Sequence, residues 1–233
     1  YGSLLSPEVQ LRIPQRYTAS IRAAQALRSG PATMMIHLAL KALPDWAAGT
    51  SLKQFAYVHL APSLAQMALT YAQATNGILP AEPVLVVGQP TAFDSSRAPE
   101  GQHTLWIQVR ALPFEVEADA LGQISPASWD DIKGLYAHRV MRLLERYAPG
   151  LQSQVLAQHV ISPLDMVRDN PNLVEGDSVS GSHHLDQFFL MRPAVGLTRW
   201  NTPIDGLFHI GASTWPGAGT GAGSGYMLAS RLA

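Results

Sequence analysis

Glycine recurs at every second position from Gly217 to Gly225 near the end of the chain, and Gly211 opens the same stretch. A short apolar run, 207–210, precedes this stretch, and a helix-forming run, 226–232, follows it, so the sequence predicts strand, glycine loop and helix in that order. Glycine lets backbone N–H groups approach a ligand closely, and a helix start carries unpaired donors at the positive end of its dipole. The arrangement suits a phosphate, a carboxylate or an electron-rich carbonyl, and a flexible loop without a ligand is the alternative.

Two common nucleotide-binding motifs do not fit this glycine run. A phosphate-binding loop of the GxxxxGK[ST] type needs a lysine that the run lacks. The dinucleotide-binding motif GxGxxG needs an acidic residue about 20 positions further on, and the chain ends before that distance is reached. We therefore expect the run to serve neither a nucleoside triphosphatase nor a first Rossmann motif.

The composition is low in charge and free of cysteine. The 233 residues are enough for one large domain or two small ones. A net charge of -1 without long blocks of like charge gives no electrostatic footprint for nucleic acid or an anionic membrane. The absence of cysteine excludes disulfides, thiolate metal sites and a cysteine nucleophile. A charged fraction of 14%, against the roughly 25% that is usual, predicts burial against a missing segment, another subunit, an apolar ligand or a membrane surface.

The apolar runs indicate where the protein is located in the cell, and the two ends indicate whether the chain is a fragment. No apolar run approaches the roughly 18 residues of a bilayer span. We expect a cytoplasmic protein, and peripheral contact with a membrane is the weaker alternative because no basic amphipathic helix is evident. The chain has no initiator Met, and 226–233 have the pattern of an unfinished helix, so we expect a fragment or a processed chain.

Hydrophobic patterns predict an α+β or α/β chain with a sheet-rich middle. The clearest helix is 128–148, where apolar residues recur at steps of three and four, Ser128 provides a cap and Pro149-Gly150 ends it. His37 lies in a short apolar run and is interpreted as a core or sheet-face histidine. The other expected elements are helices at 19–27 and 63–74, a helical turn at 163–168, and strands at 32–40, 55–60, 84–88, 104–111 and 152–161.

Metal binding, serine hydrolysis and glycoside hydrolysis have little support. His183 and His184 lie near Asp186, but adjacent histidines point in different directions, and neither HExxH nor GxSxG occurs. Glycoside hydrolysis needs two buried acids close together, and Asp165, Asp177 and Asp186 can each be turn or cap residues. That last alternative stays open, and we expect no metal site.

Several short motifs occur in a specific order along the chain. Ser-Pro-Leu-Asp at 162–165, Leu-Asp-Gln-Phe-Phe-Leu-Met-Arg-Pro at 185–193 and Thr-Pro-Ile-Asp-Gly-Leu-Phe at 202–208 precede the glycine run. With the upstream segments 29–32, 37–40, 43–45 and 145–150, they resemble the phytoene desaturase-like FAD-dependent oxidoreductases. The resemblance covers the C-terminal half of that family, and nothing in this sequence matches the family's N-terminal dinucleotide motif.

The resemblance implies a fold of two parts. A sheet-rich substrate-binding domain with helices would span 29–163. Residues 1–28 and 164–233 would be connecting and returning elements of a Rossmann-like FAD-binding domain whose N-terminal part is absent. That missing nucleotide-binding segment, or a partner chain carrying it, is the implied partner.

The resemblance also assigns site residues. It places FAD against Gly211, Ala212, Gly217, Gly219, Thr220 and Gly221. It makes His184, Phe188, Arg192 and Trp215 candidates for the wall of a substrate pocket. Two positions depart from the family pattern: Trp215-Pro216-Gly217-Ala218-Gly219 stands where many relatives have His-Pro and three glycines, and Ala212 stands where more distant flavoproteins have an acid. The resemblance names no catalytic base.

The function implied is that of a part or subunit of an FAD-dependent oxidoreductase. It would dehydrogenate a small apolar or partly apolar substrate by hydride transfer to flavin N5. The alternative is a non-catalytic binding or assembly subunit that keeps the flavoprotein scaffold without FAD.

Overall fold

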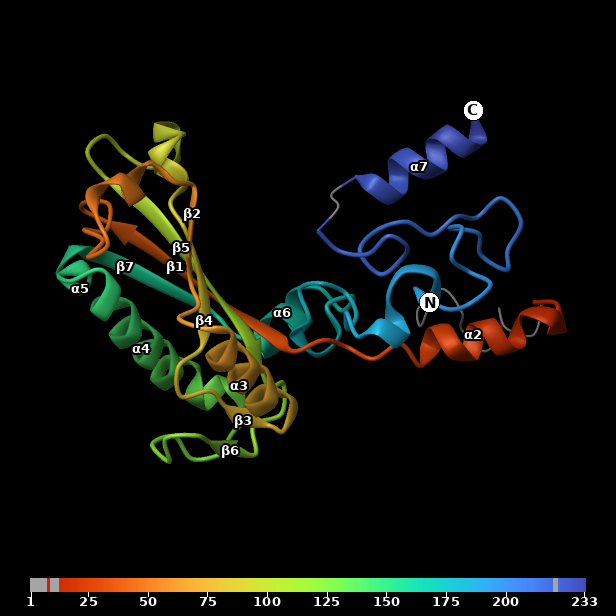
Figure 1. Cartoon of the computed structure of the whole chain (residues 1–233), viewed down its shortest axis with the longest axis horizontal. Helices are drawn as coiled ribbons and strands as arrows, with labels where there is room; N and C mark the ends of the chain where they lie inside the picture. The colour runs from red at the N-terminus through yellow and green to blue at the C-terminus, as the bar shows by residue number, and fades with distance from the viewer. Residues whose placement is uncertain (1–7, 9–12, 220–221) are drawn as a thin grey trace. The chain divides into compact units, whose positions relative to one another are not determined.

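The computed structural model describes residue 8 and residues 13–219 and 222–233 (Figure 1). Contacts divide the chain into two compact units. The terminal unit comprises Tyr1–Gly30 and Asp177–Ala233, and the central unit comprises Pro31–Gly176. The central unit extends beyond residue 163, where the sequence placed a boundary, because helix α6 (Pro163–Asp169) and the 3-10 turn η5 (Val174–Gly176) pack against each other and against strand β1.

The central unit is built on a five-stranded antiparallel sheet of order β2-β4-β5-β1-β7. Its strands confirm those expected from the alternating and apolar runs. They are β1 (Ala32–Leu40), β2 (Tyr57–Leu60), β4 (Val84–Gly88), β5 (His103–Leu112) and β7 (Val155–Ile161). Helix α3 (Leu64–Thr75) follows β2, and the short strands β3 (Ile78–Leu79) and β6 (Ala118–Asp119) form a separate parallel pair.

The last strand is shorter than the expected 152–161. Helix α5 (Leu151–Gln154) occupies its beginning. The carboxylate of Glu145 accepts hydrogen bonds from the N–H groups of Gly150 and Gln152, at 2.6 and 3.0 Å, and so holds the chain in a turn before β7. A side chain from the preceding helix therefore decides the local conformation, against the strand pattern of the segment itself.

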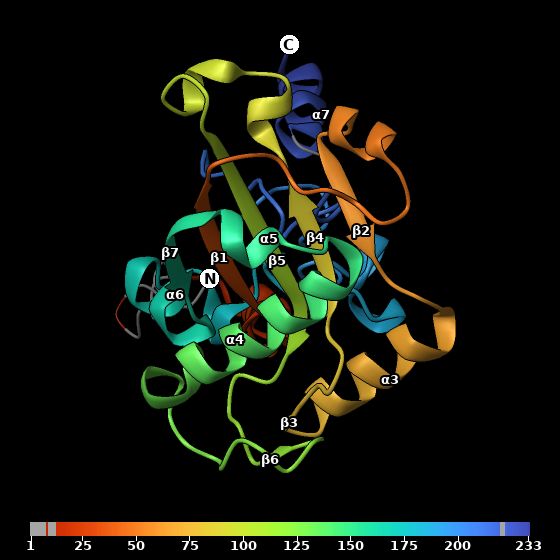
Figure 2. The same ribbon diagram turned by 90° about the vertical axis from the view of Figure 1, so that its left-hand side faces the viewer.

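Helix α4 (Trp129–Tyr147) confirms the helix expected at 128–148. It lies across one face of the sheet (Figure 2). The Ser128 hydroxyl accepts a hydrogen bond from the N–H of Asp130 at its start. Every fourth residue is buried in one cluster with the inward side chains of β1, β4 and β5, and these helix residues are Ile132, Tyr136, Val140 and Leu144. The main core therefore lies between α4 and the sheet.

A buried ion pair joins α4 to the β3–β6 region. Arg139 donates to both carboxylate oxygens of Asp119, at 2.6 and 2.7 Å, and also to the carbonyl oxygen of Pro80. The two charged side chains are 8% and 1% exposed. Burial raises the pKa of Asp119, but Arg139 and the N–H groups of Gln123 and Ile124 outweigh it and lower that pKa to about 2.

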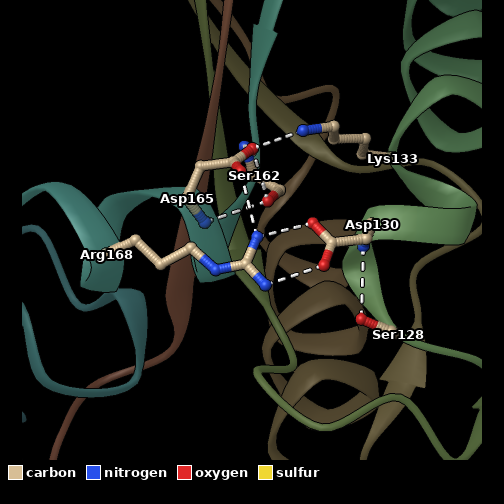
Figure 3. A network of polar contacts seen from close by, with 6 residues as sticks. All are labelled: Ser128, Asp130, Lys133, Ser162, Asp165 and Arg168. Atoms are coloured by element: carbon tan, nitrogen blue, oxygen red, sulfur yellow. Dashed lines mark hydrogen bonds and ion pairs between the residues drawn. The ribbon is translucent and has the colours of Figure 1, made fainter.

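A more exposed polar network joins α4 to α6 (Figure 3). Ser162 and Asp165 form a reciprocal cap at the start of α6, Lys133 donates to Asp165 at 2.8 Å, and Arg168 donates two hydrogen bonds to Asp130. Burial raises the pKa of Asp165, but Lys133 and Ser162 outweigh it and bring that pKa to about 2. Asp165 is a helix-capping carboxylate, as one reading of the sequence expected.

The terminal unit is mostly irregular. It contains α2 (Thr18–Gln25), the 3-10 turns η6 (Leu185–Gln187) and η7 (Phe189–Met191), and α7 (Gly223–Leu232). The strand expected at 207–210 is wrong: within the described residues, Phe208 forms an isolated bridge with Asn201, and all named strands belong to the central unit. A strand requires a longer hydrogen-bonded neighbour, so the described part does not confirm Rossmann-like returning elements.

We expect Asp119→Asn to lower the free energy of unfolding near neutral pH by about 3 kcal/mol, because it leaves a buried guanidinium without its counter-ion. The matched control is Asp130→Asn, which breaks a pair whose side chains are 44% and 54% exposed and is expected to change stability little. Urea unfolding of the full chain, followed by circular dichroism, measures both. Equal effects of the two substitutions would contradict the prediction.

The same pair makes stability depend on pH. Because the folded-state pKa of Asp119 is about 2 and its ordinary value is 3.8, the stabilisation is complete above the ordinary value and is lost as the pH falls toward 2. The difference in unfolding free energy between the wild type and Asp119→Asn is expected to stay constant from neutral pH to about pH 4 and then to shrink. Urea titrations at a series of pH values test this, and a difference that persists unchanged at pH 2 would refute it.

Candidate functional site

The glycine run borders open space at two described positions. Gly211 and Gly219 have positive φ angles of 121° and 87°, a region that favours glycine. A Cβ atom added at either position would meet nothing within 4 Å. Thr220 and Gly221, which the resemblance also assigns to the cofactor, lie outside the described residues. The described part of the run therefore offers bare backbone that a ligand can approach.

Helix α7 begins just after this run. Its first turn contains no acidic residue, and among the described residues no side chain caps its start. The buried Ser224 hydroxyl accepts a hydrogen bond from the N–H of Gly211 at 3.0 Å, which ties the helix start to the beginning of the run. The N–H groups of a helix's first turn, at the positive end of the dipole, favour an anion or an electron-rich carbonyl.

The Arg192 side chain is fully buried in the terminal unit and binds backbone carbonyl groups. Its Nε donates to the carbonyl oxygen of Ala212 at 2.9 Å, and its two terminal nitrogens donate to carbonyl oxygens of 179–182 and of Gln187. Burial lowers its pKa, and the charge of Asp177 acts in the opposite direction. Arg192 was expected at a pocket wall, and the structure uses its guanidinium to hold the loop 179–187 against Ala212.

Asp177 organises the N–H groups of the same loop. Its buried carboxylate accepts hydrogen bonds from Gly30, Val179 and Gly181 at 2.7, 2.8 and 2.7 Å. Arg192 therefore donates hydrogen bonds to the carbonyl groups of this loop, and Asp177 accepts hydrogen bonds from its N–H groups. The structure confirms Asp177 as a turn residue.

The three other candidates for the pocket wall have different surroundings. Phe188 is half-buried, and its ring would lie 3.0 Å from a Cβ added at Gly217, so it adjoins the glycine run. Trp215 is half-buried, and its carbonyl accepts a hydrogen bond from the indole of Trp200 at 2.8 Å. His184 is exposed in the loop 179–187, and its N–H donates to the Ser182 hydroxyl. The described contacts bring Phe188, but not His184, to the glycines.

His209 is a residue that the sequence argument did not single out. It lies two residues before Gly211, is half-buried, and its Nε2 lies 3.4 Å from the Ser213 hydroxyl. Burial lowers its pKa, so the neutral imidazole is favoured. Its position two residues before Gly211 was the available signal, and its apolar neighbours favoured a strand interpretation instead.

The described residues of the terminal unit fit part of FAD. Open backbone at Gly211 and Gly219, with an uncapped helix start free of carboxylates, suits the phosphates and the electron-rich ring edge of that cofactor. Among the described residues, no group of three or more His, Cys, Asp or Glu side chains is placed to hold a metal ion. The described helices include none that is both long and apolar enough to cross a membrane.

We expect Arg192→Lys to loosen the loop 179–187, because one ammonium group cannot reach carbonyl oxygens spread around a planar guanidinium. The loss is expected to be roughly 2 to 4 kcal/mol of local stability, since several charge-assisted hydrogen bonds are broken in a buried site. Hydrogen exchange of the loop amides measures it, with the exposed Arg199→Lys as control. Unchanged protection of these amides in Arg192→Lys would disprove this role.

Comparisons with known proteins agree with an oxidoreductase. No family model matches the chain. Pyridine nucleotide-disulfide oxidoreductase domain-containing protein 2 of Rattus norvegicus is 28% identical over 156 residues, which cover 66% of this chain and 26% of that protein. Prolycopene isomerase of Daucus carota is 33% identical over 62% of this chain and 22% of that protein. Phytoene desaturase (lycopene-forming) of Pseudescherichia vulneris is 29% identical over 58% of this chain and 25% of that protein.

These matches limit what similarity establishes. The matching part of this chain spans about a quarter of the length of these curated relatives, 22% to 26%. Activities, substrates and partners of the whole relatives therefore belong to those proteins. The chain is similar in sequence to part of a group of oxidoreductases and carotenoid-modifying enzymes.

Proposed function

We propose that this chain is the C-terminal part, or one subunit, of an FAD-dependent oxidoreductase that dehydrogenates an apolar or partly apolar substrate. The observation that carries the proposal is the glycine run, whose open backbone at Gly211 and Gly219 leads into the uncapped start of α7. The sequence similarity to a phytoene desaturase supports the same conclusion. FAD, when bound, supplies a ring system that accepts a hydride from a substrate C–H bond.

The residues of this chain would bind and orient the cofactor. The N–H groups of the first turn of α7 would stabilise negative charge on the ring edge that faces them. Gly211 and Gly219 would allow the backbone to approach the cofactor closely, and Gly217 would do so beside the ring of Phe188. Arg192 acts as a positioning residue, because it fixes the carbonyl of Ala212 within the same segment.

The adenosine part of FAD would be bound by a different segment. No dinucleotide motif of the GxGxxG type with a following acid occurs in the sequence. We infer that a nucleotide-binding segment preceding this chain in a longer protein, or a partner chain, supplies that motif.

The first test is the visible absorption spectrum of the chain purified from its native source without denaturation. Oxidised flavin is coloured, so we expect colour in material that retains the nucleotide-binding segment. A colourless protein that stays colourless after that segment is restored and FAD is added would refute the proposal and favour a cofactor-free binding subunit.

A matched pair of glycine variants tests the glycine run itself. Gly219→Ala adds a Cβ in the open space of the run, and Gly122→Ala adds one in open space of the central unit, where φ is also positive at 63°. Both substitutions carry a similar backbone cost. We expect the flavin content per protein to fall in Gly219→Ala and to stay unchanged in Gly122→Ala. Equal flavin content in the two variants would contradict a cofactor role for the run.

A further inference from the structure

The strand β2 lies at one margin of the central sheet, and its outer side pairs with no other described strand (Figure 2). The N–H of Gln89 donates to the carbonyl oxygen of Ala56 at 2.8 Å, so these two residues form a hydrogen-bonded pair. Such pairs alternate along an antiparallel ladder, so Val58 also directs its backbone groups toward β4. The N–H and C=O groups of Tyr57 and His59 therefore point outward, away from the sheet.

A groove runs along this free edge. The cavity has a volume of about 570 Å³, and all the residues of β2 line it. Successive side chains of a strand lie on opposite faces of the sheet, so a cavity lined by all of them lies beside the strand and not over one face. Its other wall is formed by the segment before β2 and by the end of α4, through Trp46, Leu52 and Tyr147. The groove therefore has the position that an added strand would occupy.

The edge lacks the features that usually keep sheet edges apart. Charged side chains, prolines and bulges have that effect in natural proteins. Strand β2 contains none of these features and keeps an unbroken register with β4, whereas β7, at the other edge, has a register shift against β1. Residues 54–81 contain no Asp, Glu, Lys or Arg. Two copies can therefore meet along this stretch without opposing like charges.

Large apolar side chains beside the edge are left exposed. Phe55 is 55% exposed, Tyr57 is 57% exposed, and Leu64, at the start of α3, is 83% exposed. A large side chain has about 150 to 250 Å² of surface, so these residues leave roughly 400 Å² of apolar area in water. A stable interface buries about 800 Å² on each partner. The exposed side chains thus supply about half of that area, and the groove walls and the strand backbone are available for the remainder.

The strand is complementary to a second copy of itself. When two β2 strands pair antiparallel around Val58, Tyr57 of each copy lies opposite His59 of the other. These outward-pointing residues then exchange their N–H···O bonds, in pairs related by the two-fold axis. Val58 belongs to the core on the α4 side, and it meets Val58 of the second copy on that same side, so the faces of the two sheets match. This is the in-phase alignment in which every bonded pair lies within β2.

We propose that β2 pairs with β2 of a second copy across a two-fold axis at Val58, and that this contact joins the two central sheets into one continuous sheet. A strand edge needs backbone hydrogen-bond partners, which a lipid surface or a packed helix does not supply. A two-fold pairing closes the interface, because the free β2 edge of each copy is used once. The inference goes beyond the proposed function, since it concerns the assembly of the central unit and its test needs neither flavin nor turnover.

The oligomeric state of the full chain is the first test. Sedimentation velocity from about 1 to 100 µM is expected to show a monomer–dimer equilibrium that ends at the dimer. His59→Lys is expected to raise the dimer dissociation constant at least about tenfold, because it places an unpaired charge in the contact. Adding Tyr57→Glu to that variant is expected to restore the dimer, because the new carboxylate lies opposite the new ammonium group of the other copy. The matched control is Leu156→Lys, at a 46% exposed position of β7, which is expected to leave the dissociation constant unchanged.

A single introduced cysteine tests the register, because the chain has no cysteine of its own. Opposite residues of a non-hydrogen-bonded pair have Cα atoms about 4.5 Å apart, within the range of a disulfide. In Val58→Cys, diamide is expected to give a covalent dimer, because it accepts the electrons and protons that the paired thiols lose. His59→Cys places the thiols diagonally, with Cα atoms more than about 7 Å apart, and is expected to give no more covalent dimer than the exposed Leu156→Cys.

Three results would overturn the inference. These are a monomer throughout the concentration range, association that continues past the dimer, or a dimer that His59→Lys leaves unchanged. A dimer that is cross-linked through His59→Cys and not through Val58→Cys would contradict the stated register. Circular dichroism shows whether each variant folds, and the cysteine variants carry the test if His59→Lys does not fold. None of these results bears on the glycine run, so flavin content tests the proposed oxidoreductase function separately.

Discussion

The central unit depends on the register of its antiparallel strands. Ile36 and Ile107 lie opposite each other and face α4, and the same alignment places Trp106 opposite His37 on the other side. Side chains alternate along a strand, so a slip of one residue would exchange the two faces. The large apolar residues of β1 and β5 would then leave the core, and this cost keeps the alignment unique. One register therefore determines both the core and the residues on the opposite face of the sheet.

The terminal unit is organised by polar contacts instead. Its described apolar cluster is small, containing Ala24, Ala194 and Leu197. Arg192 and Asp177 both organise the loop 179–187, because one donates to its carbonyl groups and the other accepts from its N–H groups. A buried charged group that loses these partners is costly, so the loop has few alternative conformations. The glycine run is thus positioned by hydrogen bonds more than by apolar packing.

The sequence predicted those elements whose determinants are local. Helix 128–148 carries its own apolar stripe and cap, and the strands of the sheet carry their own apolar or alternating patterns, so both were found. The turn at Leu151–Gln154 depends on Glu145 from another helix, and the segment 207–210 has only a single bridging partner, Asn201, in the described chain. Contacts made by residues outside a segment leave no periodic signal in the segment itself.

The candidate site likewise contains features that the sequence predicts and features that depend on contacts made by other segments. The sequence predicted glycine positions 211 and 219, and the structure adds that both border open space, whereas Gly217 adjoins Phe188. The role of Arg192 depends on carbonyls contributed by 179–187 and by Ala212, and the position of the Trp106 ring depends on which strand lies beside β5. Because the indole of Trp106 occupies the volume above Gly88, these two positions cannot vary independently. In a diverging lineage the tryptophan must shrink or turn away before position 88 can acquire a side chain, so the order of substitutions, and not only their identity, is constrained by this contact.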